Sequence, residues 1–287
     1  MSGMGRGTYL LAWATDTHFD MATPDAVDAF VSELRELSPD GLLITGDVAT
    51  ALTLEQSLIE LAEILAMPVY FVLGNHDSYG GSISETRSLA ERLNEHEYLY
   101  WLPAAGRIAL APGVSMVGHG GWADGRNGIG VDKSHVQMND FVEILELSIA
   151  QRKGEMADTL SELGDESAAA VEALIRDSYE LGDRHVLVAT HVPPFAESAW
   201  HEGALSDAEH LPHFSNSAMG DMLRSIAHEL PDLSVTVCCG HTHSSGVFAP
   251  SEVNGLVVHT GAAHYRQPGL AGFFDVDTDL IRGQRVR

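Results

Sequence analysis

The sequence contains few cysteines, few basic residues and no long hydrophobic segment. Its two cysteines, Cys238 and Cys239, are neighbours in an apolar run, and neighbouring strand residues point to opposite faces, so we expect no disulfide between them. We interpret this as a reduced, cytoplasmic setting. No apolar run approaches the ~20 residues that span a bilayer, so we expect no membrane partner. The apolar run at residues 8–15 leads into Asp16, which favours a first strand over a signal peptide.

The charge balance is strongly acidic. The 287 residues include 41 Asp and Glu against 16 Lys and Arg, a formal net charge of −25. This charge repels a polyanionic backbone, and no basic cluster in the sequence offsets it, so we expect no nucleic-acid partner. We interpret the acidity as a contribution to solubility or an adaptation to a salty environment. Hydrophobic residues make up 45% of the chain, enough for one large core or two modest ones.

Apolar runs alternate with helix-like segments along the chain. Two segments, 24–37 and 54–66, have helical patterning, and each ends shortly before a proline. Strands that alternate with helices indicate an α/β fold with a largely parallel central sheet, and we expect residues 1–287 to form a single domain. The expected strands are 8–15, 41–45, 68–73, 114–118, 185–190, 235–239, 256–260 and 272–276.

The stretch at residues 134–182 is long, acidic and helix-patterned, and it falls between two expected strands. It is too long for an ordinary connection, so we predict a helical insertion there. Its apolar stripes must pack on other parts of the protein. Two interpretations remain open: a helical pair that covers a sheet edge, or one wall of a substrate cleft, where its acidity would disfavour polyanions.

Polar side chains follow five of the expected strands. Taken singly, each group has an ordinary explanation as a turn, a helix cap or a loop. The carboxyl ends of strands in an open α/β sheet share one edge, where ligands bind, so the five groups should meet. Together they supply more Asp, His and Asn side chains than turn chemistry requires. The groups are Asp16-Thr17-His18, Gly46-Asp47, Gly74-Asn75-His76-Asp77, His191 and Gly240-His241-Thr242-His243.

The chemistry of these side chains indicates a metal site. In extended backbone, residues i and i+2 face the same way, so we expect Asp16 and His18 to reach one ion, and His241 and His243 to face one pocket. Carboxylate, amide and imidazole ligands without thiolate suit Mn, Fe or Zn better than Ca or Mg. A carboxylate can also bridge two ions, which lie ~3.5 to 4 Å apart in hydrolytic two-metal sites.

The whole series resembles the signature of the calcineurin-like metallophosphoesterase superfamily, in every block and in order, from residue 16 to residue 243. The resemblance implies a sandwich of two β-sheets flanked by helices, with a dinuclear metal centre. It assigns Asp16, His18, Asp47 and His243 to the first metal. It assigns Asp47, Asn75, His191 and His241 to the second, with Asp47 as the bridge.

The same resemblance implies hydrolysis of a phosphoester by a metal-activated water. His76 would steady the phosphoryl oxygens or protonate the leaving group. Asp77 would orient the imidazole of His76 and favour its protonated form. The expected substrate is a small phosphodiester or phosphomonoester. The resemblance leaves the natural substrate and the oligomeric state open.

Departures from the signature indicate which branch of the superfamily the chain resembles. Protein Ser/Thr phosphatases resemble Gly-Asp-x-Val-Asp-Arg-Gly and Gly-Asn-His-Glu, whereas this chain reads "GDVATAL" and "GNHD", without the phosphate-binding Arg. The pattern is closer to the bacterial branch that includes cyclic-nucleotide phosphodiesterases. Two alternatives stay open: a non-catalytic scaffold or partner-binding module of the same fold, and a nuclease, which the acidity disfavours.

Other histidines are candidates for the surroundings of the site. His119 follows an expected strand and is a candidate for the lining of the pocket. A long loop after His191 contains three more, and we expect it to rim the pocket without supplying a metal ligand. These three are His201, His210 and His213.

Overall fold

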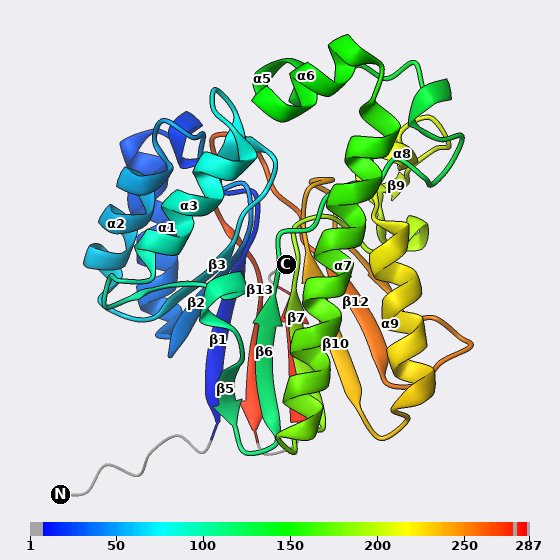
Figure 1. The fold of residues 1–287 in the computed structure, drawn as a ribbon. Coiled ribbons are helices and arrows are strands. Elements are labelled where there is room, and N and C mark those ends of the chain that lie inside the picture. The colour runs from blue at the N-terminus through cyan, green and yellow to red at the C-terminus, as the bar shows by residue number, and fades with distance from the viewer. Residues whose placement is uncertain (1–7, 278–279, 286–287) are drawn as a thin grey trace, which may run out of the picture.

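The computed structural model describes residues 8–277 and 280–285, and it shows two six-stranded β-sheets packed face to face between layers of helices (Figure 1). In spatial order, the first sheet consists of β14 (Leu280–Arg285), β13 (Leu270–Asp277), β1 (Tyr9–Ala14), β2 (Gly41–Thr45), β3 (Val69–Val72) and β4 (Leu99–Trp101). The second consists of β11 (Gly246–Phe248), β12 (Leu256–Thr260), β10 (Ser234–Cys239), β7 (His185–Ala189), β6 (Val114–Gly118) and β5 (Ile108–Ala111). A small hairpin pairs β8 (Trp200–His201) with β9 (Ala204–Leu205).

Helices cover the outer face of each sheet (Figure 1). Within the described residues, none combines the length and the apolar composition that crossing a membrane requires. The first sheet packs against α1 (Pro24–Leu37), α2 (Leu54–Leu65) and α3 (Ile83–Leu93), and the second against α7 (Met156–Glu180) and α9 (Ser217–Glu229). The shorter helices are α4 (Leu102–Ala105), α5 (Asp140–Glu143), α6 (Leu145–Lys153) and α8 (Leu211–Phe214), with 3-10 turns at Phe19–Met21, His76–Ser78, Val131–Lys133 and Ala196–Ser198.

The central strands are buried on both faces, which explains their nearly continuous apolar sequences. In β1, Leu11 and Trp13 point into the core between the two sheets, whereas Ala12 and Ala14 face the helices. Leu187 of β7 meets the first pair from the opposite sheet. One sandwich core and two helix-facing cores therefore hold the strand ends, and the loops that follow them, in fixed positions.

The eight expected strands are all present, each within two residues of its expected ends. The expectation of one largely parallel sheet is wrong, because the parallel strands belong to two sheets; the sandwich that the resemblance implies is confirmed. The strands missed by the sequence reading include the short β4 and the antiparallel edge strands β5 and β11, whose three or four residues give little periodicity.

Residues 134–182 contain α5, α6 and α7. α7 connects the parallel strands β6 and β7 and packs Val171 and Ile175 into the core beneath the second sheet. Such a crossover helix is what a parallel pair requires, and it covers the face of the sheet instead of its edge. α5 and α6 lie beyond the ends of the strands (Figure 1). Within residues 134–182, only the part before α7 can therefore contribute to the region at the carboxyl ends of the strands.

The helix-facing core of the first sheet gives a stability prediction. Phe71 on β3 is fully buried there, so Phe71→Ala should lower the free energy of unfolding by about 3 to 5 kcal/mol, through lost apolar contacts and the cavity left behind. The measurement is urea denaturation followed by circular dichroism. The exposed Leu52 is the control, and Leu52→Ala should change stability by less than about 0.5 kcal/mol. Equal effects of the two changes would contradict this packing.

Candidate metal centre

All seven expected metal ligands lie together at the carboxyl ends of β1, β2, β3, β7 and β10, as the sequence predicts. They form two groups that share Asp47. The first group consists of Asp16, His18, Asp47 and His243, and the second of Asp47, Asn75, His191 and His241.

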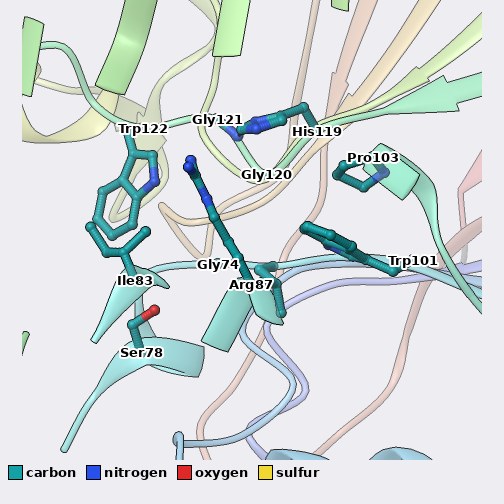
Figure 2. Close-up of a pocket in the computed structure, with 11 residues that line it drawn as sticks. Gly74, Ser78, Ile83, Arg87, Trp101, Pro103, His119, Gly120, Gly121 and Trp122 are labelled. Atoms are coloured by element: carbon teal, nitrogen blue, oxygen red, sulfur yellow. The ribbon is translucent and has the colours of Figure 1, made fainter. Parts of the chain in front are cut away.

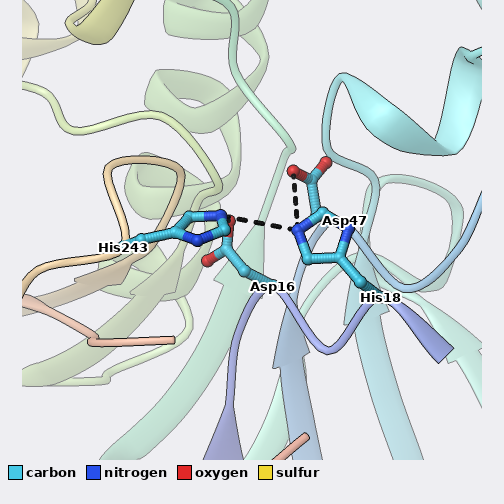
Figure 3. A group of neighbouring side chains, drawn as sticks. All are labelled: Asp16, His18, Asp47 and His243. Carbon is cyan, nitrogen blue, oxygen red and sulfur yellow. Dashed lines mark hydrogen bonds and ion pairs between the residues drawn. The ribbon is translucent and has the colours of Figure 1, made fainter. Parts of the chain in front are cut away.

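In the first group, the two carboxylates and two imidazoles point toward one another (Figure 3). One ligand atom from each residue can be chosen so that all four lie within 4.8 Å of one another. His18 Nε2 lies 3.4 Å from His243 Nε2 and 3.8 Å from Asp47 Oδ2. His243 Nε2 lies 3.3 Å from Asp16 Oδ1. Three of these four residues are fully buried, so the group is positioned by the interior of the fold.

The second group is tighter. Asn75 Oδ1 lies 3.0 Å from both His191 Nε2 and His241 Nδ1, and these two nitrogens lie 3.2 Å apart. His191 Nε2 is also 3.4 Å from Asp47 Oδ1. Ligands around an ion at about 2.1 Å lie roughly 3.0 to 3.4 Å from their neighbours. The spacing of this group therefore fits one small cation.

The hydrogen bonds behind the second group fix which atoms face inward. His191 Nδ1 donates to the Thr45 carbonyl at 2.9 Å, and His241 Nε2 donates to the His213 carbonyl at 2.9 Å. Each remaining ring nitrogen therefore presents a lone pair, an assignment made from the hydrogen-bond network. Asn75 Nδ2 donates to Asp140 Oδ1 at 2.9 Å, so Asn75 Oδ1 faces the two imidazoles as a further acceptor. Acceptors that crowd together without a hydrogen between them repel unless a cation lies among them, so the donor set fits a metal ion.

The charges agree with this fit. Burial raises the pKa of Asp47, and the neighbouring Asp16 and Asp77 raise it further. Burial also acts to raise the pKa of Asp16, but the hydrogen bond with His243 and the nearby imidazoles bring that pKa below its usual value. Among the described residues, no Lys or Arg pairs with these carboxylates. Burial lowers the pKa of both His18 and His191 to about 3, which keeps their lone pairs available at neutral pH.

Several of these side chains are aimed by unusual backbone conformations. Asp16 and His18 belong to one group, and His241 and His243 line one cleft, as expected. The expected reason, extended backbone, is wrong, because all four residues have positive φ, between 41° and 69°. Asp47 has a φ of 52°. Left-handed backbone in a non-glycine residue costs about 1 to 3 kcal/mol and gathers at functional sites. His241 consequently joins the second group and His243 the first.

Asp77 has a different position from the expected one. Its carboxylate accepts hydrogen bonds from the backbone N–H groups of Asp47, Val48, Ala49 and Gly74, at 2.7 to 3.1 Å. The prediction that it orients the imidazole of His76 is wrong, because both of its oxygens bind backbone. Asp77 instead ties the loop after β2 to the loop after β3, which fixes the shared Asp47 beside Asn75.

His76 lines the cleft in front of the two groups. Its ring stacks on Tyr79 with centroids 4.1 Å apart, and its Nδ1 has no hydrogen-bond partner among the described residues. Burial lowers the pKa of His76 to about 4, although the nearby Asp140 opposes this. Burial therefore works against the expected protonated form of the imidazole, and the neutral ring of His76 can still form hydrogen bonds.

A cleft of about 400 Å³ opens from the two groups. The sequence reading missed several of its contributors. The ring of Tyr265 lies tilted against those of His18 and His243, with centroids 4.8 and 4.6 Å away, and could have been found because it follows the strand 256–260. Tyr79 comes two residues after Asp77 in the segment that follows β3, so its place in the sequence could have pointed to it. Asp140, which accepts a hydrogen bond from Asn75 Nδ2, follows no strand of the signature, and no sequence signal pointed to it. Residues 136–139, which precede α5, form another part of the lining.

The remaining histidines divide between two cavities. His119 does not line the cleft; it lines a separate cavity with Arg87, Trp101 and Trp122 (Figure 2). That cavity measures about 20 Å³, room for roughly one water molecule, so it cannot hold a phosphoester. The loop after His191 rims the cleft as expected. Its residues His201 and His210 are part of the lining, while His213 contributes its carbonyl to the second group.

Comparisons with known proteins agree with the fold. A family model described as calcineurin-like phosphoesterase matches residues 10–245. A dimetal phosphatase from Danio rerio has a TM-score of 0.60 at 14% identity, covering 98% of this chain and 97% of that one. A phosphopantetheinyl hydrolase from Mycobacterium tuberculosis has a TM-score of 0.57 at 14% identity, with 91% of each chain covered. Among curated proteins, none matches the sequence significantly. The two structural likenesses show a shared fold.

Close backbone approach at Gly240 gives a prediction. A Cβ at this position would overlap Thr15 Oγ1 and Asp16 Oδ2, so Gly240→Ala should push the Asp16 carboxylate out of the first group. We expect the affinity for Mn²⁺, measured by calorimetric titration, to fall by at least about tenfold. Gly269→Ala is the control, because a Cβ there meets only open space and a carbonyl at 4.0 Å. Unchanged Mn²⁺ affinity in Gly240→Ala would contradict the placement of Asp16.

Proposed function

The chain belongs to the calcineurin-like phosphoesterase family, and we propose that it hydrolyses small phosphoesters at a centre of two metal ions. The observation that carries this proposal is the pair of ligand groups that share Asp47, each with acceptor atoms converging on one point. Mixed carboxylate, amide and imidazole ligands favour Mn, Fe or Zn. When bound, such a pair lowers the pKa of a coordinated water and polarises a phosphoryl oxygen.

Two of the proposed ligands also hold neighbouring loops in place. Asp16 holds the loop after β10, since its carboxylate accepts from the His241 N–H at 3.0 Å. Asp47 holds the loop after β3 in the same way, by accepting from the His76 N–H at 2.9 Å. The proposed ligands thus also tie neighbouring loops together, which fixes the geometry before a substrate arrives.

His76 is the proposed catalytic side chain of the cleft. Its ring lies 4.7 Å from the ring of His18, edge to face, beside both ligand groups. In our proposal it donates a hydrogen bond to a phosphoryl oxygen or to the departing oxygen of the substrate. A neutral imidazole can do this through its ring N–H, which agrees with the low pKa that burial gives it.

The cleft lining supports small substrates. Among the described residues that line it, none is Lys or Arg, so these residues are poorly suited to the many charges of a polyanion. Phe214 and Tyr265 offer aromatic surface, and Gln137 and Asn139 offer amide groups. We propose that residues 136–139 form one wall against the substituent of the phosphoester. The acidic charge of the chain supports a partner other than nucleic acid.

Substitutions at Asp47 and His76 separate metal binding from chemistry. Asp47→Ala should lower bound metal and abolish hydrolysis of bis-para-nitrophenyl phosphate together, because both ligand groups lose a member. His76→Ala should keep its metals and reduce kcat by about 10² or more. Metal analysis of the same preparations checks both. An active, metal-replete Asp47→Ala protein would refute the shared ligand, and a fully active His76→Ala protein would remove His76 from the mechanism.

The proposed cleft wall gives a specificity prediction. Residues 136–138 can be replaced by Gly-Ser-Gly without touching α7, whose side chains belong to the core. We expect a change in the ranking of kcat/KM values across a panel of phosphomonoesters, cyclic nucleotides and phospholipid headgroup esters. The metal content should stay the same. The control places Gly-Gly at residues 202–203, in the exposed turn between β8 and β9, where both residues have positive φ. An unchanged ranking in the first variant would make the segment a structural cover only.

A further inference from the structure

The two ligand groups differ in what lies behind them. Two members of the second group, Asn75 and His241, have partners in segments that also border the cleft, while His191 is held by the Thr45 carbonyl. Asn75 is held by Asp140 at the start of α5, and His241 by the carbonyl of His213 in α8. In the first group, the Asp16 carboxylate is held by the Thr15 hydroxyl and the His241 N–H, which belong to the loops after the strands.

These two bordering segments, residues 134–140 and 207–214, are joined to each other. Ser134 Oγ donates to the Glu209 carbonyl at 2.8 Å and accepts from His213 Nε2 at 2.9 Å. The His135 N–H donates to Glu209 Oε2 at 2.8 Å. They therefore behave as one unit, the cap, which lies over the second ligand group.

Asp140 is the side chain through which the cap reaches the site. It is 7% exposed, and its Oδ1 accepts from Asn75 Nδ2 at 2.9 Å and from the Tyr79 hydroxyl at 2.5 Å. An amide has a donor end and an acceptor end, and an ionised carboxylate can only accept. Asp140 therefore makes the Nδ2 end of Asn75 face the cap and the Oδ1 end face His191 and His241.

We infer that Asp140 is a positioning residue that orients the Asn75 amide, so that the ion of the second group depends on the cap while the ion of the first group does not. This inference rests on the proposed two-metal function. Loss of an outer partner of a metal ligand commonly weakens metal binding by 10- to 100-fold, and here the loss should fall on one ion of the two.

Manganese titration of the purified, metal-stripped protein tests this, by calorimetry with metal analysis after dialysis. Wild-type protein should bind two equivalents. Asp140→Ala should bind the first with unchanged affinity and the second about 10- to 100-fold more weakly. Asp140→Asn keeps the shape, so it tests the idea even if the alanine variant fails to fold. Its amide can present either end to Asn75, so its second equivalent should bind with intermediate affinity.

Glu143→Ala is the matched control, since Glu143 is an exposed acid on the same short helix, and it should bind both equivalents as wild type does. Two wild-type affinities in both Asp140 variants, or equal weakening of both equivalents in a folded variant, would overturn the inference. A wild-type protein that binds fewer than two equivalents would overturn the inference together with the two-metal function. A wild-type protein that binds two equivalents without hydrolysing any phosphoester would overturn the function alone.

Discussion

The structure around the strand ends depends on one electrostatic constraint: hydrogen-bond acceptors are packed against one another in a buried place. His191 Nε2 and His241 Nδ1 lie 3.2 Å apart beside Asn75 Oδ1, and burial, together with the neighbouring Asp16 and Asp77, raises the pKa of Asp47. This arrangement is unfavourable by itself, so the loops that carry it must be held firmly. Cations that bind there recover the lost electrostatic energy, which is why the site is suited to metals.

The restraint comes from the sandwich and from hydrogen bonds between loops. Asp77 collects four backbone N–H groups from two loops, which stabilises a left-handed backbone at Asp47 that would otherwise cost free energy. Glycine at positions 74 and 240 allows the loops to approach Asp47 and Asp16 more closely than any side chain would permit. Strain at the ligands is thus balanced by contacts of residues that are not part of the cleft lining.

The sequence was sufficient to predict the strands and the meeting of the ligands, because strand periodicity and the common edge of parallel strands are local and topological rules. It could not predict how the ligands are aimed. Asp16 and His243 owe their directions to positive φ values, which no spacing rule reports. Asp140 lies outside the signature and meets Asn75 across 65 positions of sequence, so only the folded chain reveals it. Asp77 was assigned to His76 by resemblance, whereas its carboxylate binds backbone.

The central claim is that Asp47 lies between two ions. Anomalous diffraction at the manganese edge, from crystals grown with Mn²⁺, measures this directly. The account predicts two peaks ~3.5 to 4 Å apart, one beside His18 and His243 and one beside His191 and His241, with the Asp47 carboxylate touching both. A single peak, or two peaks of which only one contacts Asp47, would contradict it.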